Sequence, residues 1–143
     1  MSTEGRMRGI ARFAVVAAGI TLLTACITTD SDTNRIQSQT PSYTLTADEL
    51  YRDYEANEVA ADATYKGRIV VVSGTVQSIG KDIMDTAYVV IGGTGILDGV
   101  QCMFTRDEEA SVARLSVGQR VSIQGEVSGR VIGNVLIRGS RLR

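Results

Sequence analysis

The chain has 143 residues, of which 43% are hydrophobic and 22% charged, and its formal net charge is −1. This length suits one domain with a buried core, and the apolar content excludes a chain that is disordered throughout. The near-neutral charge argues against a protein that coats nucleic acid non-specifically. The sequence contains no histidine and only two cysteines, which removes most catalytic and metal-binding chemistry.

The first 25 residues have the pattern of an export signal. Three arginines stand against one glutamate in residues 1–12, an uncharged run of 11 residues follows from Phe13 to Leu23, and small residues precede Cys26. A short transmembrane anchor is the alternative, but a span needs about 20 apolar residues and this run is shorter. We therefore expect residues 1–25 to be a signal peptide.

The signal ends in the tetrad Leu23-Thr24-Ala25-Cys26, which resembles the lipobox of bacterial lipoproteins. The resemblance implies that the Cys26 thiol receives a diacylglyceryl group, that the chain is cut before it and that its new amine is acylated. Three acyl chains exceed the two signals that stable anchoring needs. The implied location is the bacterial cell envelope, where Ile27 in place of aspartate favours the outer membrane, facing the periplasm.

The segment after the anchor, residues 26–45, is rich in Ser, Thr, Gln and Asn and contains the only proline, Pro41. Such a composition cannot bury enough apolar surface to become ordered, so we expect a disordered tether. A flexible chain of this length would hold the following domain roughly 25 Å from the membrane surface.

An acidic amphipathic helix is predicted next, from Thr46 to a point within residues 64–67. Thr46 and Glu49 have the spacing of a capping box. The large apolar residues share one face, which consists of Leu50, Tyr54, Ala61 and Tyr65. Residues 46–63 carry a charge of −5, whereas residues 66–143 carry +3. Two explanations of this uneven charge are open. Either the helix is simply a solvated acidic helix beside a mildly basic barrel, or the basic C-terminal strands face an anionic partner.

The rest of the chain predicts a mainly β fold. Five strands are expected at residues 69–79, 87–91, 100–104, 120–127 and 135–138, the last ending near Leu142, with a short helical stretch at residues 106–115. Three strands, a helix and two strands is the order of the OB-fold, a five-stranded Greek-key barrel. A five-stranded sandwich or an SH3-like barrel is the alternative, but the helix between the third and fourth strands weighs against both. We place the helix and barrel at residues 46–143, with the barrel over about 66–143.

Several short segments of this region occur together in a known family. They are Ala47-Asp-Glu-Leu-Tyr51, Tyr54-Glu-Ala-Asn-Glu58, Ala60-Ala-Asp62, Tyr65-Lys-Gly67, Gly74-Thr-Val76, Ile79-Gly-Lys-Asp82, Val100-Gln-Cys102 and Gly118-Gln119. With them, residues 46–142 resemble the tRNA-anti-like OB-fold family of bacterial envelope proteins and lipoproteins. The resemblance implies the fold and leaves the ligand open, because the family is a domain of mostly unknown role.

The sequence predicts no enzyme, no cofactor and no metal site. Cys102 alternates with Val100 and Phe104 on one strand face, so we expect a buried core residue in place of a reactive thiol. The acids of residues 82–85 and 107–109 fit a turn and a helix start better than a catalytic carboxylate pair. The glycine-rich run at residues 92–95 lacks the lysine and the helix of a phosphate-binding loop, so a hairpin loop is expected.

The remaining function is binding. We predict a membrane-anchored envelope lipoprotein whose OB-fold domain is a non-catalytic binding module for a small ligand, a glycan, a peptide or a protein. The alternatives are a single-stranded nucleic-acid-binding domain and a structural assembly protein of the envelope. Nucleic acid is disfavoured because the barrel has only two aromatic residues, Tyr88 and Phe104, on which bases could stack. The expected binding face comprises Tyr88, Gln101, Met103, Arg120, Arg130 and Arg138.

Overall fold

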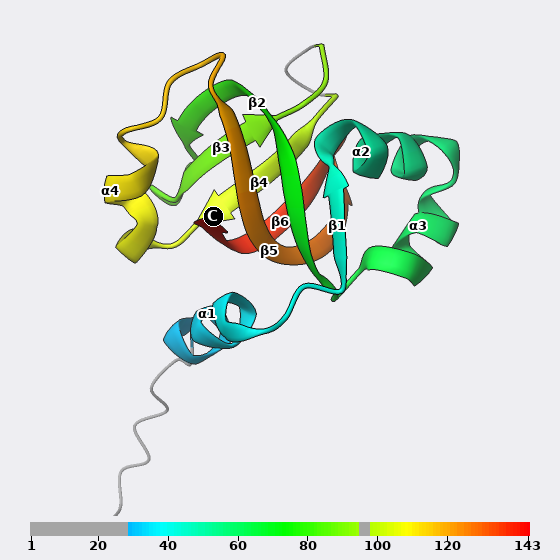
Figure 1. Ribbon diagram of the computed structural model, residues 1–143, viewed down its shortest axis with the longest axis horizontal. Helices are drawn as coiled ribbons and strands as arrows, with labels where there is room; N and C mark the ends of the chain where they lie inside the picture. Colours follow the sequence, from blue (N-terminus) through cyan, green and yellow to red (C-terminus); the bar gives the residue numbers. More distant parts are fainter. Residues whose placement is uncertain (1–28, 95–97) are drawn as a thin grey trace, which may run out of the picture.

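A computed structural model describes residues 29–94 and 98–143, which are built around a closed barrel of five strands (Figure 1). The strands are β2 (Ile69–Lys81), β3 (Ala87–Ile91), β4 (Val100–Phe104), β5 (Arg120–Val131) and β6 (Asn134–Leu142). They follow one another around the barrel as β2-β3-β4-β6-β5, and β5 pairs with β2 to close it. Strands β4 and β6 run parallel, while the other neighbours in the barrel are antiparallel. This arrangement confirms the predicted OB-fold and excludes the sandwich.

The alternation of side chains along each strand places one row in the barrel interior. Val100, Cys102 and Phe104 on β4 are all buried, as predicted. Val121, Ile123 and Val127 on β5 are buried as well. Strand β2 is long because residues 69–75 pair with β5 and residues 76–81 pair with β3, so one strand serves both halves of the barrel.

Gly125 stands where β5 passes closest to β6. A Cβ atom at this position would lie 2.4 Å from the Ile137 side chain and 2.8 Å from the carbonyl oxygen of Arg138. The pairing between β5 and β6 shifts its register at this residue, between Gln124 and Glu126. Only glycine therefore allows the two backbones to approach this closely.

Two helices form where the sequence predicted one. They are α2 (Ala47–Ala56) and α3 (Glu58–Tyr65), and Asn57 separates them with an extended backbone. The break occurs because the Asn57 side-chain oxygen accepts the Ala60 N–H at 3.1 Å and so begins a new helix. The predicted capping box is confirmed, since Thr46 and Glu49 bond reciprocally. The second helix ends at Tyr65, within the predicted range.

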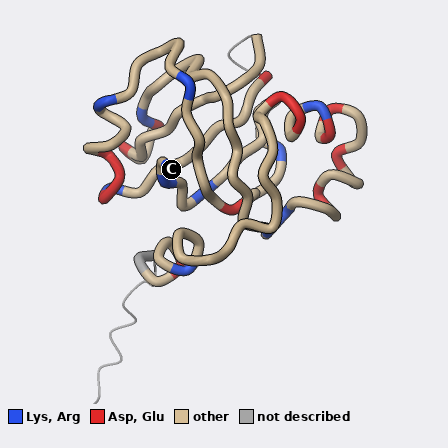
Figure 2. The backbone as a smooth tube through the Cα atoms, viewed as in Figure 1, with Lys and Arg blue, Asp and Glu red and all other residues tan. Residues whose placement is uncertain are grey.

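The predicted apolar face of these helices packs on the barrel. Leu50 and Tyr54 are fully buried and Ala61 is nearly so, whereas Val59 is 81% exposed. The Tyr54 hydroxyl donates to Asp62 at 2.9 Å and ties the two helices together. Acidic residues are concentrated in α2 and α3, as the red segments at the right of Figure 2 show, and Asp53 also accepts a hydrogen bond from the Tyr65 hydroxyl at 2.7 Å.

A short helical stretch also lies between β4 and β5, as predicted. It consists of a 3₁₀ turn, η1 (Arg106–Glu108), followed by α4 (Glu109–Val112). Val112 is buried and packs against the barrel core.

The described part of the predicted tether is ordered, so this prediction was wrong. Helix α1 (Thr29–Ser38) precedes β1 (Tyr43–Thr46), and β1 pairs in parallel with residues 70–73 of β2. The argument from composition failed because the barrel supplies hydrogen-bond partners and apolar contacts that the segment cannot supply to itself. Ile36 is 2% exposed, packed close to Gly139 of β6.

Two buried polar residues on the outside of β5 hold α1 in place. Gln124 donates its side-chain N–H groups to the backbone oxygens of Ile36, Gln37 and Gln39, at 3.2, 3.3 and 3.0 Å. These oxygens lie at the C-terminal end of the helix, where carbonyl groups have no partner within the helix. Glu126 accepts from Arg35 of α1 at 2.9 Å and from Nε of Arg138 at 3.0 Å. Helix α1 is therefore clamped to the wall of the barrel.

The predicted signal peptide, the residues that resemble a lipobox and Cys26 lie outside the described residues. In the part of the chain that the structure describes, no helix is both long enough and apolar enough to span a bilayer.

The close approach at Gly125 gives a test of the barrel. We expect Gly125→Ala to lower the free energy of unfolding by about 3 kcal/mol, because the new methyl group meets backbone and a β-branched side chain that cannot move aside. Gly118→Ala is the control, since its Cβ meets nothing within 4 Å and only the positive φ of 88° is strained, which costs about 1 kcal/mol. Urea unfolding measures both, and equal losses would contradict the steric account.

The clamp on α1 predicts a pH dependence. Burial alone would raise the pKa of Glu126, but the hydrogen bonds from Arg138 and Arg35 outweigh it, so its pKa lies below the ordinary value of 4.5. The stabilisation by this carboxylate is therefore complete above about pH 4.5 and is lost as the pH falls through the lowered pKa. In urea unfolding at neutral and acid pH, Glu126→Gln should show a smaller loss of stability on acidification than the wild type. Glu55→Gln, at an exposed position of α2, should keep the full loss.

Candidate binding face

The outward side chains of β3, β4 and β6 form a continuous surface, which we call the binding face. Their inward neighbours fill the core, so the outward set consists of Tyr88, Val90, Gln101, Met103, Leu136 and Arg138. The register places Tyr88 beside Met103, and it places Gln101 between Val90 and Leu136. Most of these side chains are half-buried, so part of each one is accessible to a binding partner.

The structure brings together four of the six residues predicted for this face. Tyr88, Gln101 and Met103 lie on β3 and β4. Arg138 lies on the adjacent strand β6, directly after Ile137, the register partner of Cys102. The other two, Arg120 and Arg130, lie elsewhere on the barrel. Leu136 was missed because the sequence does not show that the last strand runs beside β4.

The side chains of the face are held by local contacts. The Gln101 amide nitrogen is 3.3 Å from the Met103 sulfur, and its amide oxygen accepts from Asn134 at 3.4 Å. Asn134 is buried at the start of β6 and also accepts the Gly99 N–H at 3.1 Å. The Tyr88 ring lies across Gly80 of β2, where a Cβ atom would be 2.8 Å from its hydroxyl oxygen. These contacts orient the polar groups before any partner binds.

The binding face is uncharged apart from one residue. Arg138 is its one charged residue, and the guanidinium of Arg138 bonds to Glu126, which also pairs with Arg35 of α1. The outward residues of β3 and β4 include no acid and no lysine. A surface of low charge with one tyrosine, one methionine and one leucine has the composition of the centre of a protein interface, where charged side chains are depleted.

The side chain of Arg130 contacts other residues of the protein and is not presented on the binding face. Its guanidinium lies 5.4 Å from the centre of the Tyr51 ring on α2, and its Nε donates to the carbonyl oxygen of Gly133 at 3.2 Å. This residue therefore joins the β5–β6 hairpin to α2 by a cation–π contact and by a hydrogen bond from its terminal nitrogen to the Tyr51 hydroxyl at 3.4 Å.

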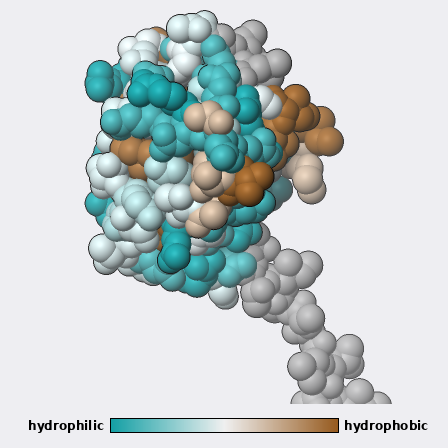
Figure 3. Space-filling model, turned by 90° about the vertical axis from the view of Figure 1, so that its right-hand side faces the viewer, coloured by the Kyte–Doolittle hydropathy of each residue, from teal (hydrophilic) through white to brown (hydrophobic). Residues whose placement is uncertain are grey.

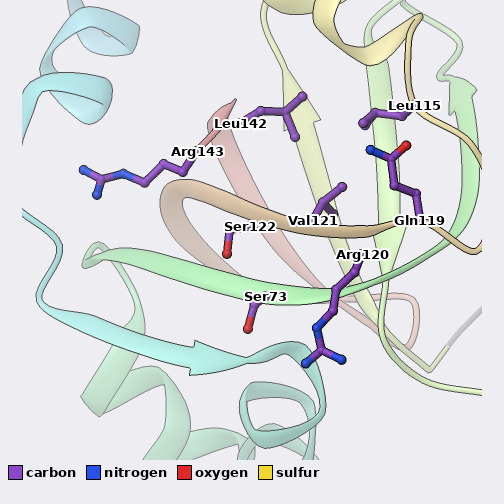
Figure 4. A pocket seen from close by; sticks show the side chains of 8 residues that line it. All are labelled: Ser73, Leu115, Gln119, Arg120, Val121, Ser122, Leu142 and Arg143. Atoms are coloured by element: carbon purple, nitrogen blue, oxygen red, sulfur yellow. The ribbon is translucent and has the colours of Figure 1, made fainter.

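Arg120 lines a separate open hollow of about 510 Å³, where the first half of β2 pairs with the start of β5 (Figure 4). Its lining consists of Ser73, Leu115, Gln119, Arg120, Val121, Ser122, Leu142 and Arg143. Ser73 and Ser122 are register partners, and their hydroxyls point the same way, with the guanidinium groups of Arg120 and Arg143 on opposite sides of them. Within residues 29–94 and 98–143, neither guanidinium has an ion-pair partner. The hollow thus offers two free cations and two hydroxyls to an anionic group.

Two loops with exposed apolar tips border the binding face at opposite ends. The β2–β3 turn carries Ile83 and Met84, which are 105% and 79% exposed. The β5–β6 hairpin carries Val131 and Ile132, which are 50% and 84% exposed. The corresponding loops of OB-folds take part in ligand binding. Apolar surface is otherwise confined to a few places in the view of Figure 3, where teal and white predominate.

The described residues contain little reactive chemistry. Cys102 is fully buried, and burial raises the pKa of its thiol, so the thiol stays protonated and inaccessible, as predicted. Among residues 29–94 and 98–143, no group of three or more histidine, cysteine, aspartate or glutamate residues could hold a metal ion. Gly93 donates its N–H to Asp48 at 3.0 Å, so this glycine-rich loop binds a carboxylate of the chain itself.

The two acids of the β2–β3 turn serve the turn, as predicted. Asp82 accepts the backbone N–H groups of Met84 and Thr86, at 2.8 and 2.9 Å. Asp85 pairs with Lys81 at 3.0 Å. The structure therefore gives both carboxylates a local partner.

Comparison with solved structures finds chains that are similar to this one. One is described as a "putative nucleic acid-binding lipoprotein" from Klebsiella pneumoniae subsp. pneumoniae MGH 78578; it is 19% identical, covers 77% of this chain and 96% of its own, and has a TM-score of 0.56. Another, "OBody NL8 bound to hen egg-white lysozyme", is 24% identical over 52% of this chain and 91% of its own, with a TM-score of 0.38. A search of curated proteins gives no significant match.

The family comparison agrees with the barrel topology. The model of the tRNA_anti-like family matches residues 7–141, which is nearly the whole chain. The strand order, the parallel pairing of β4 with β6 and the short helix between β4 and β5 are those of an OB-fold. The chain therefore belongs to the tRNA_anti-like family of OB-fold domains.

Proposed function

We propose that this protein is an envelope lipoprotein, anchored through Cys26, whose OB-fold barrel binds a protein or peptide partner without catalysing a reaction. The anchor is supported by the Leu23-Thr24-Ala25-Cys26 tetrad and the basic and apolar segments before it. It is also supported by the similar structure that is described as a lipoprotein. The location that fits this anchor is the outer membrane, facing the periplasm.

The low charge of the binding face carries the proposal for the partner. Its accessible atoms come from Tyr88, Gln101, Met103, Leu136 and Arg138, and Arg138, its one charged residue, is exposed but already paired with Glu126. Tyrosine and methionine are enriched at protein interfaces, and methionine adapts its shape to different apolar partners. The preset amide of Gln101 adds a polar group that can fix the orientation of a bound chain. An apolar peptide or an apolar patch on a folded protein fits such a surface.

The hollow of Figure 4 favours a second candidate, a single-stranded nucleic acid or another anionic chain. Arg120 and Arg143 lie on opposite sides of the Ser73 and Ser122 hydroxyls, so two phosphate groups of an extended chain could each meet a guanidinium. The similar structure is described as putatively nucleic acid-binding, which points the same way. Against it, Tyr88 is the only aromatic residue on the binding face, and sequence-tolerant binding of single strands uses several stacked aromatics.

The anchor can be tested directly. In cells that process lipoproteins, we expect Cys26→Ser to abolish labelling with palmitate and to move the protein out of the membrane fraction, because the thiol that accepts the lipid is absent. Cys102→Ser is the matched control, since a buried core thiol should accept no lipid. Continued labelling of the Cys26→Ser protein would contradict the proposal.

The binding face can be tested by crosslinking in the cell. A photoreactive amino acid in place of Met103 should give an adduct with a protein, because this position lies in the middle of the face. The same amino acid in place of Val59, an exposed residue of α3, should give none. A nuclease-sensitive adduct from position 120, without a protein adduct from position 103, would favour the second candidate. Equal adducts from positions 103 and 59 would contradict a specific face.

A further inference from the structure

We propose that the β2–β3 turn, residues 82–86, inserts Ile83 and Met84 into the surface of the lipid bilayer beside the anchor. The inference rests on the proposed lipidation of Cys26, and it assigns an additional membrane contact to the folded domain. It implies that the barrel is held in one orientation on the membrane.

The turn presents an apolar tip flanked by two carboxylates that already have partners. The side chains of Ile83 and Met84 are almost entirely exposed. The carboxylate of Asp82 bonds to the backbone N–H groups of Met84 and Thr86, within the turn. Asp85 pairs with Lys81, which also pairs with Glu109 of α4. The tip can therefore leave water without leaving an unpartnered charge at its end.

The covalent chain places this tip on the side of the anchor. Thr29, the first residue of α1, follows Cys26 by three positions, and three residues can span at most about 11 Å in any conformation. Helix α1 is clamped to the barrel by Gln124 and Glu126, so it cannot act as a long tether. Thr33 of α1 and Met84 line the same cavity of about 340 Å³. The turn thus lies across one hollow from the helix that leads to the lipid.

The other exposed apolar tip points elsewhere. Ile132 lies six residues along β5 from Glu126, which corresponds to roughly 20 Å at about 3.3 Å per residue. Its hairpin packs toward α2 through Arg130 and Tyr51. Of these two apolar turns in the described part of the chain, the β2–β3 turn is therefore the one adjacent to α1.

The size of the tip favours a bilayer over a protein as its occupant. A stable protein interface buries about 800 Å² on each partner, which needs a broad apolar patch around the tip. The turn has two apolar residues, and Asp107 and Glu108 of the neighbouring 3₁₀ turn are acids. A fluid bilayer accepts an isolated apolar tip, and a zwitterionic surface does so without repelling these carboxylates.

The experiment uses the full-length protein, made and lipidated in cells and reconstituted into phosphatidylcholine vesicles. Met84→Cys carries an environment-sensitive fluorophore, and Ile132→Cys carries the same fluorophore as the matched control. Cys26 is consumed by the lipid and Cys102 is fully buried, so each variant has one reactive thiol. Both positions are exposed, so the label should leave the fold intact, and thermal unfolding of each labelled protein verifies this.

We expect brominated phosphatidylcholine to reduce the emission from position 84 and to leave that from position 132 unchanged. We also expect aqueous iodide to quench position 132 more strongly than position 84. Equal quenching at the two positions would overturn the inference. Protection of position 84 from iodide without quenching by brominated lipid would also overturn it, because a protein would then cover the tip. A protein that fails to float with the vesicles would overturn the lipid anchor itself, and the inference with it.

Discussion

The pairing of β2 with β5 closes the barrel, and the rest of the structure depends on this closure. Strand β2 must bend so that its two halves pair with β5 and β3, and β5 must pass close enough to β6 that only glycine fits at position 125. Once the ring is closed, each strand gives one row of side chains to the core and the other row to the outside. The interior is filled by aliphatic residues, Phe104 and a buried thiol.

The outward rows differ in character around the ring, and these differences define the surfaces of the molecule. Outside β5, the buried side chains of Gln124 and Glu126 bind α1. Outside β3, β4 and β6, the row is uncharged apart from Arg138 and mostly half-buried. Between them, the hydroxyls of Ser73 and Ser122 lie beside the free guanidinium of Arg120. The outside of the barrel therefore has three distinct surfaces. They are the docking site of α1, the binding face and the cationic hollow at Arg120.

With the lipid anchor proposed at Cys26, the contacts that hold α1 on the barrel would set the relation between the domain and the membrane. A disordered segment of 20 residues would let the barrel move freely at some distance from the lipid, whereas a clamped helix fixes both its distance and its orientation. Gln124 is well suited to this role because one amide satisfies three carbonyl groups at the end of the helix. Arg35 and Arg138 together compensate the charge of Glu126, so the carboxylate is buried without an energetic conflict.

Local patterns in the sequence determined the strands, the capping box at Thr46 and Glu49, the apolar helix face and the burial of Cys102, because each depends on neighbours within a few positions. The order of strands and the intervening helix were enough to predict the OB-fold. The break at Asn57 was missed, because helical periodicity continues across an asparagine whose side chain can either face solvent or begin a new helix.

Only the tertiary structure decided which distant residues meet. Composition predicted disorder for residues 26–45, because it reflects only the few apolar residues of the segment itself. It contains no information on Gln124 and Glu126 of β5, which bind α1. The six residues predicted for binding divided between the binding face, a cation–π contact and a hollow, because arginines with the same sequence pattern have different partners across the barrel. Local structure depends on neighbouring residues, whereas the sites of this protein arise from residues up to 91 positions apart that the closed sheet brings together.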